Sequence, residues 1–130
     1  MRRKGISILV SIVLAIGLGL LSMPQPALAD SCTSAGTGNW TAISWSCSHV
    51  RADGDSVTIA AGHTVTLNTD VANLAGLIIN GTGSLDANGF NITLTGDWTN
   101  DGGTFTPGTG TVTFNGSSTQ TISASEGNSK

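Results

Sequence analysis

Residues 78–85 read IINGTGSL, and residues 98–105, which lie 20 positions further along the chain, read WTNDGGTF. The two segments align without a gap, and the same shift places residues 92–96 (ITLTG) on residues 112–116 (VTFNG). The repeat also extends backwards, because residues 55–76 form a more divergent copy. A fixed period of this kind is typical of solenoid proteins, in which each repeat is one structural unit stacked on the next.

Within each copy, apolar residues alternate with Thr or Ser, as in residues 56–59 (SVTI) and 111–114 (TVTF). This alternation predicts short β-strands that bury one face. Turn-forming residues such as Asn80 and Gly81 separate the strands. The part of the chain after residue 29 has no helical period, so we expect an all-β protein.

A unit of about 20 residues with several short strands fits either one coil of a parallel β-helix or a meander of antiparallel hairpins. In a β-helix the coils stack about 4.8 Å apart, which would build internal ladders of like residues. One such ladder would contain Val65, Leu85 and Phe105, and another would contain Leu74, Leu94 and Phe114. A meander gives no reason for a gap-free period. We therefore expect a single-stranded, right-handed parallel β-helix, with an antiparallel β-sandwich as the alternative.

The first 29 residues have the pattern of a cleavable secretory signal peptide. The basic residues 2–4 (RRK) precede an apolar stretch over residues 6–21, and residues 27–29 (ALA) form a small-x-small cleavage site. The apolar stretch is shorter than the roughly 20 residues that a membrane-spanning helix needs, which favours cleavage over an uncleaved anchor. Cleavage would leave Asp30 as the first residue, and we expect the mature protein to be secreted or at the cell surface.

The predicted mature chain is acidic. Its 101 residues contain two bases, Arg51 and Lys130, against eight Asp and Glu residues, so its net charge is −6. Such a surface repels phosphate backbones and anionic lipid headgroups, which argues against nucleic acids and membranes as partners and leaves sugars and cations. The length allows one domain and no separate catalytic module.

The N-terminal part of the mature chain differs from the repeats, because it contains Trp40, Trp45 and both cysteines. In an oxidising compartment Cys32 and Cys47 are expected to form a disulfide that closes a loop of about 15 residues. A metal or redox pair is the alternative, but the two thiols have neither CxxC spacing nor a nearby His with ligand spacing.

These observations divide the chain into four parts. We interpret residues 1–29 as the signal peptide, 30–54 as an N-terminal cap, 55–123 as solenoid coils and 124–130 as a disordered tail. The C-terminal part has no comparable cap, which predicts an open edge after the last coil. Either the chain is a piece of a longer protein, or other copies of it meet that edge.

Several motifs occur in order along the chain: residues 38–40 (GNW), Trp45, and residues 54–59 (GDSVTI), 62–67 (GHTVTL) and 109–116 (TGTVTFNG). With these motifs the sequence resembles the N-terminal β-helical region of large secreted bacterial surface proteins, similar in style to the G8 domain and to adhesin-like repeat proteins. The resemblance implies an extracellular protein, usually much longer, in which this region mostly has no demonstrated enzymatic site.

Few residues are suited to catalysis. His49 and His63 have no nucleophile placed by a recognisable motif, and structural or surface roles are the alternative for both. Asp86 is the only acid near a strand in the middle coil, whereas glycoside hydrolysis needs two carboxylates. A polysaccharide lyase would need a basic residue, and Arg51 is the only internal one. We therefore expect no enzymatic activity, with a polysaccharide-cleaving enzyme acting through Asp86 or His63 as the alternative.

Two ligand classes have candidate residues. Ca²⁺ prefers carboxylate and carbonyl oxygens, so Asp53, Asp55, Asp97 and Asp101 are candidate ligands, although their spacing matches no known calcium loop and turns also use Asp and Gly. Sugar rings stack on exposed aromatic faces, and the candidates are Trp40, Trp45 and Trp98, for which packing in the cap or core is the alternative.

The sequence as a whole is interpreted as an extracellular structural or adhesive β-solenoid module of a cell-surface protein. A carbohydrate-binding module is the alternative. The expected partners are surface glycans or other copies of the chain at the open C-terminal edge, and no cofactor is expected.

Overall fold

A computed structural model describes residues 29–47 and 53–125 of the chain. These ranges contain ten β-strands and no helix that is long and apolar enough to cross a membrane. Most of the expected signal peptide, both His49 and Arg51, and residues 126–130 of the expected tail lie outside the described residues. The strands are β1 (Ser31–Thr33), β2 (Gly38–Asn39), β3 (Ser56–Ile59), β4 (Thr64–Thr66), β5 (Val71–Asn80), β6 (Ser84–Asp86), β7 (Ile92–Asp101), β8 (Thr104–Thr106), β9 (Val112–Phe114) and β10 (Ile122–Ser125).

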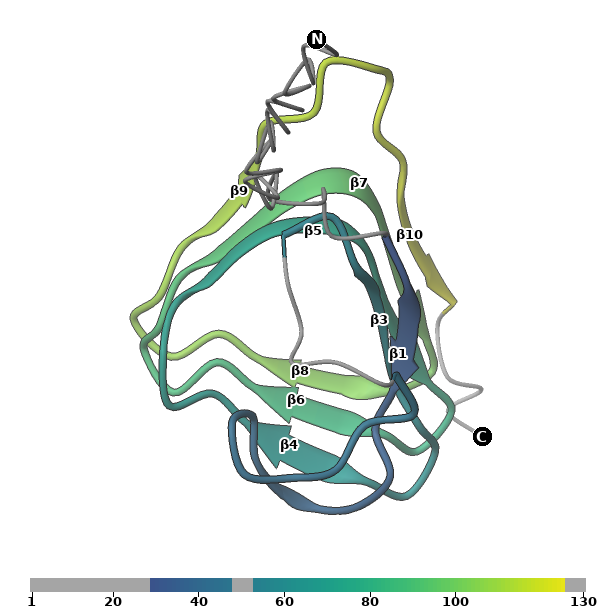
Figure 1. Cartoon of the computed structure of the whole chain (residues 1–130), viewed down its shortest axis with the longest axis vertical. Coiled ribbons are helices and arrows are strands. Elements are labelled where there is room, and N and C mark those ends of the chain that lie inside the picture. Colours follow the sequence, from purple (N-terminus) through teal and green to yellow (C-terminus); the bar gives the residue numbers. More distant parts are fainter. Residues whose placement is uncertain (1–28, 48–52, 126–130) are drawn as a thin grey trace, which may run out of the picture.

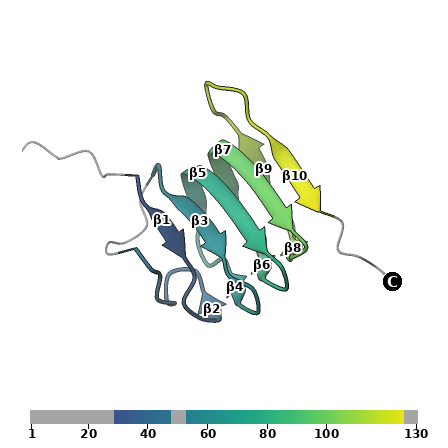
Figure 2. The same ribbon diagram turned by 90° about the vertical axis from the view of Figure 1, so that its right-hand side faces the viewer.

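The strands form two parallel sheets. One sheet has the order β1-β3-β5-β7-β10, with β9 also paired to β7, and the other has the order β2-β4-β6-β8. Viewed along the coils the outline is roughly triangular (Figure 1), and from the side the strands lie next to one another in chain order (Figure 2). The protein is an all-β parallel solenoid of about four turns with roughly 21 residues per turn. The predicted β-helix is confirmed, and the antiparallel sandwich is excluded.

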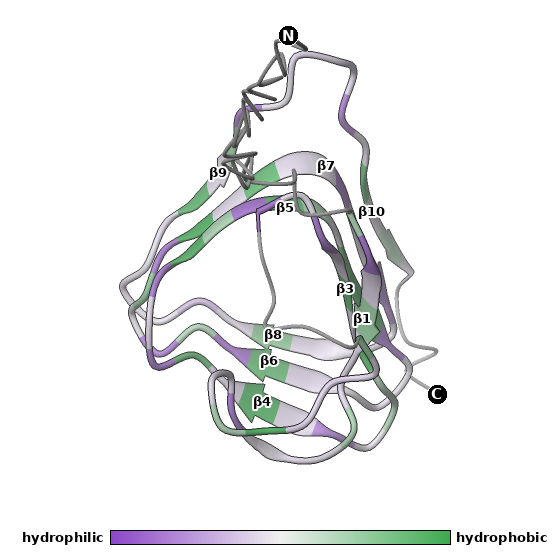
Figure 3. Cartoon of the chain, in the orientation of Figure 1, coloured by the Kyte–Doolittle hydropathy of each residue, from purple (hydrophilic) through white to green (hydrophobic). Residues whose placement is uncertain are grey.

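Both predicted internal ladders are present. Leu85 pairs with Val65 on one side and with Phe105 on the other, and Leu94 pairs in the same way with Leu74 and Phe114. The residues in the middle of these ladders are fully buried. Hydrophobic residues recur on strands such as β1, β4 and β10, whereas hydrophilic residues gather near the corners (Figure 3). The core is therefore a set of columns that run through successive coils.

The gap-free period is wrong along one side of the molecule. It would align Ile78 with Trp98, but Trp98 pairs with Leu77, and Ile78 pairs with Thr99, an offset of 21 residues. Because side chains alternate between the two faces of a strand, this shift by one residue decides which of them enters the core. Leu77 and Trp98 are 1% and 7% exposed, whereas Ile78 is 38% exposed. The period of 20 returns at the next strand, where Ser84 pairs with Thr104.

The corner between the two halves of the larger sheet lengthens from coil to coil. In three successive coils the chain takes three positions from Leu74 to Leu77, four from Leu94 to Trp98, and eight from Phe114 to Ile122. The last of these corners is the loop that projects from the body between β9 and β10 (Figure 1). After the loop the chain returns to the sheet, and β10 continues to Ser125, two residues beyond the boundary drawn from the sequence.

The base of this loop is held by one side chain, Gln120. Its Oε1 accepts a hydrogen bond from the N–H of Gly116 at 2.8 Å, and its Nε2 donates to the carbonyls of Leu94 at 3.1 Å and Gly96 at 2.7 Å. These carbonyls lie on β7, where the last coil leaves the sheet. The Gln120 amide therefore replaces the backbone groups that a continuous strand would have supplied.

Candidate functional site

The first coil is closed by its own chain. The segment expected as a cap supplies β1 and β2, which pair with β3 and β4, and residues 44–47 then cross back over β1. Ser46 N–H donates to the Thr33 carbonyl at 2.9 Å, and Ala35 N–H donates to the Ser44 carbonyl at 3.0 Å. The predicted disulfide between Cys32 and Cys47 is confirmed, and it ties the crossing segment to β1.

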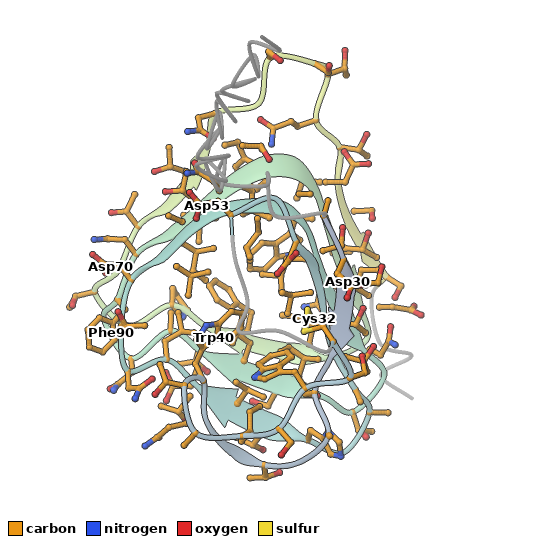
Figure 4. The ribbon with its side chains drawn as sticks, viewed as in Figure 1. Asp30, Cys32, Trp40, Asp53, Asp70 and Phe90 are labelled. Atoms are coloured by element: carbon orange, nitrogen blue, oxygen red, sulfur yellow. A yellow bond between two sulfur atoms is a disulfide. The ribbon has the colours of Figure 1, made fainter. Side chains whose placement is uncertain are left out.

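The tryptophans of this segment pack against each other. Trp40 is 5% exposed and lies within the outline of the coils (Figure 4). Its ring meets that of Trp45 edge-on at 4.9 Å, and Trp45 Nε1 donates to the Trp40 carbonyl at 3.2 Å. In the third coil Trp98 meets Phe105 edge-on at 4.7 Å. These contacts favour the packing alternative for Trp40 and Trp98 over stacking on a sugar.

The four candidate calcium ligands lie on different coils. Asp55 is fully buried, and the other three are exposed and accept hydrogen bonds from the adjacent coil. The donors are Asn73 Nδ2 to Asp53 at 2.8 Å, Thr121 N–H to Asp97 at 2.8 Å, and Ser125 Oγ to Asp101 at 2.7 Å. No three His, Cys, Asp or Glu side chains gather within residues 29–47 and 53–125. Calcium binding by these residues has no support in their placement.

His63 contacts a hydroxyl that the sequence analysis did not pair with it. Ser34 Oγ lies 3.0 Å from His63 Nδ1 and accepts a hydrogen bond from the Ala60 N–H at 2.9 Å. Ser34 is only 3% exposed, so a substrate cannot reach its hydroxyl. The pair links β1 to the turn after β3, and the separation of 29 residues left no signal of it in the sequence.

The last coil is open. We call the open end the apolar surface formed by Trp98, Phe105, Val112, Phe114 and Ile122, which together line a shallow hollow of about 270 Å³. Ile122 is 65% exposed, and Phe105, Val112 and Phe114 are half-buried. Among the described strands, β8 is the last of its sheet. The open end is therefore the exposed cross-section of the core.

A second hollow lies outside the coils, where the corners widen. We call it the corner groove; it has a volume of about 460 Å³ and is lined by residues that include Ser56, Gly76, Ile78, Asp97 and Ser118. Ser56, Gly76 and Asp97 stand side by side in register, so the missing side chain of Gly76 leaves a gap between a hydroxyl and a carboxylate. The projecting loop contributes Ser118 to the wall.

The backbone does not require glycine at position 76. Gly76 has no positive φ, and a Cβ built on it would come no closer than 3.4 Å to its nearest neighbour, Ser56 Oγ. By contrast, a Cβ on Gly96 would collide with the Ala75 carbonyl. Glycine in the interior of a strand weakens it and often marks a place where another group approaches closely. The consequence of Gly76 is the groove itself.

Parallel coils around a columnar core, closed at one end and open at the other, define a β-solenoid module. Residues 44–130 match the family model of the G8 domain. Because the match covers more than half of the chain, the chain belongs to the G8 domain family. Comparisons with curated proteins and with solved structures gave no match. The G8 part of the resemblance is thus confirmed, and the bacterial adhesin part stays a prediction.

Proposed function

We propose that this G8 domain is an extracellular structural module whose open end is covered by a second copy of the chain. The observation that carries the proposal is the difference between the ends: residues 44–47 cover β1, whereas aromatic side chains of the core face outward at the other end. An exposed apolar surface next to unpaired strand edges favours association. The signal-peptide pattern and the disulfide support a location outside the cytoplasm.

The closed first end selects the geometry of the pair. Head-to-tail stacking would need an open N-terminal end, which the segment 44–47 occupies. Two open ends can meet through a two-fold axis, and this brings like strands together in antiparallel pairs. The strands of the open end (β8, β9 and β10) carry no charged residue, although the predicted mature chain has a net charge of −6. Two identical surfaces can therefore meet without charge repulsion.

The two most exposed large hydrophobic residues provide a matched test. Ile122 lies in the open end and Ile78 on the outer flank. We expect the mature protein to be a dimer by light scattering, Ile122→Asp to be a monomer, and Ile78→Asp to remain a dimer. A monomeric parent protein at all accessible concentrations, or equal loss of the dimer in both variants, would overturn the proposal. A stable monomer would also point to a different protein as the occupant of the open end.

A second candidate function, binding of a neutral saccharide, is favoured by the corner groove. Its hydroxyls and the Asp97 carboxylate can exchange hydrogen bonds with sugar hydroxyls, and Ile78 offers an apolar contact beside them. The groove contains no basic residue that would attract an acidic sugar. This candidate assigns the adhesive role to the groove instead of the tryptophans.

The saccharide candidate is tested by filling the gap at Gly76. Addition of cello-, manno- and chito-oligosaccharides should shift the amide NMR signals of Gly76 and Ile78, and Gly76→Val should abolish these shifts without lowering the Tm. Gly36→Val is the control, because a Cβ on Gly36 has no neighbour within 4 Å and the residue lies outside the groove. Absence of shifts with every oligosaccharide, or shifts that survive in Gly76→Val, would discard the candidate.

A further inference from the structure

The backbone nitrogen of Asp30 lies against a buried carboxylate. It donates a hydrogen bond to Asp55 Oδ1 at 2.9 Å, and the Asp55 side chain is fully buried. The next groups of the chain are fixed as well, since the Asp30 carbonyl accepts from Ser56 N–H at 2.8 Å and the Asp30 carboxylate accepts from Ser31 N–H at 2.8 Å. Asp30 is thus held immediately before β1, which begins at Ser31 (Figure 4).

This nitrogen is also the atom that signal cleavage would release. The small-x-small site ends at Ala29, and hydrolysis of the bond between Ala29 and Asp30 consumes one water molecule. It leaves a carboxylate on Ala29 and an amine on Asp30, and the amine takes up a proton at neutral pH. The neutral amide donor that faces Asp55 becomes an ammonium group at the same place.

We propose that cleavage after Ala29 creates an ion pair between the new α-ammonium group of Asp30 and the Asp55 carboxylate, and that this pair locks β1 onto the solenoid. A buried carboxylate is costly unless an opposite charge or strong donors accompany it. The ammonium group supplies both, because hydrogen bonds between charged groups are stronger than those with a neutral amide. Asp55, a candidate calcium ligand from the sequence, is thereby assigned to the processed N-terminus.

The locked element carries the closed end of the molecule. Cys32 on β1 holds the disulfide, and Thr33 on β1 accepts the hydrogen bond from the crossing segment. The ion pair at Asp30 is two residues before the disulfide, so processing and oxidation would secure the same strand from its two sides. This role depends on the predicted cleavage and is independent of how the open end is covered.

The test compares three forms of the chain that differ only at the N-terminus. One begins at Asp30, one retains Ala29 before Asp30, and one begins at Asp30 with its α-amino group acetylated. The form with the unmodified Asp30 amine should have the highest Tm, by about 5 °C or more over the other two. Asp55→Asn should remove most of this advantage. A Tm that is equal in all three forms would overturn the proposal, and this result does not require any Asp55 variant to fold.

Two controls make the result specific. Asp53→Asn changes the same charge two residues away on an exposed side chain, and it should leave the Tm difference between the forms unchanged. Equal loss of Tm from Asp55→Asn in the Asp30 and Ala29 forms would contradict the ion pair, because a double-mutant cycle then shows no coupling. The full chain exported by a bacterial host should have the mass of a product that begins at Asp30, and any other first residue overturns the proposal. The Ile122→Asp monomer should show the same Tm dependence, so that failure of the dimer proposal is distinguished from failure of this one.

Discussion

The first and last coils of this solenoid are built from similar strands, yet they end the molecule in different ways. At the first coil, residues 44–47 pair with β1 and the disulfide holds them there. At the last coil, Phe105 and Phe114 occupy the same columns as the buried Leu85 and Leu94 but remain half-exposed. The difference teaches that burial in a solenoid is set by the presence of the next coil, and not by the apolar character of the residue alone.

The largest expected effect compares two residues of one column. Leu85→Ala should lower the free energy of unfolding by about 4 kcal/mol, because it opens a cavity between two coils in a fully buried position. Phe105→Ala should cost about half as much in dilute, monomeric protein, because the ring is partly exposed already. Urea denaturation of both variants measures the difference, and equal losses would break the comparison between interior and open end.

The disulfide should contribute slightly less than the column residue. The double variant Cys32→Ser/Cys47→Ser should lose about 3 kcal/mol, the value expected for closure of a 15-residue loop. The loss should be accompanied by faster hydrogen exchange in β1 and unchanged exchange in β8. The parent protein under reducing conditions is the control, and it should reproduce the thermal denaturation of the variant. Loosening of β8 instead of β1 would be contrary to the assignment of the disulfide to the closed end.

Gln120 should matter less, and at the other end of the molecule. Gln120→Ala removes three partly buried hydrogen bonds at the base of the projecting loop and should cost about 1 to 2 kcal/mol. Gln120→Glu keeps the acceptor for Gly116 but loses both donors, and its carboxylate would face the Leu94 and Gly96 carbonyls. We expect it to be no more stable than the Ala variant in thermal denaturation. Parent-like stability of Gln120→Glu would show that the two donated bonds contribute nothing.

The exposed bonds between coils should have the smallest effects at both ends. Asp53 accepts from Asn73 near the first coil, and Asp101 accepts from Ser125 near the last one. Because all of these groups can exchange hydrogen bonds with water, Asp53→Ala and Asp101→Ala should each cost about 0.5 kcal/mol or less. A loss above about 1 kcal/mol in one of them, measured by urea denaturation, would mean that the ends differ on their flanks as well as in their cores.

The repeat made the fold predictable, because residues 20 positions apart share an environment when coils stack. Both internal ladders followed from it, and the disulfide followed from the oxidising compartment that the signal sequence indicates. The register of Trp98 did not follow, since a corner that gains one residue is invisible in an alignment that the next turn restores. Gln120, the pairing of Ser34 with His63 and the contact of Asp30 with Asp55 also escaped, because each joins residues at separations unrelated to the repeat.

The measurement that tests the central claim most directly is residue-resolved hydrogen exchange of the mature protein over a range of concentrations. The account predicts that amides of β8 (Thr104–Thr106) become more protected as the concentration rises, because two open ends cover each other. Amides of β1 (Ser31–Thr33) should be protected to the same degree throughout, because their own chain covers them. Protection that rises in β1 while β8 stays unchanged would contradict the assignment of a closed first end and an open last end.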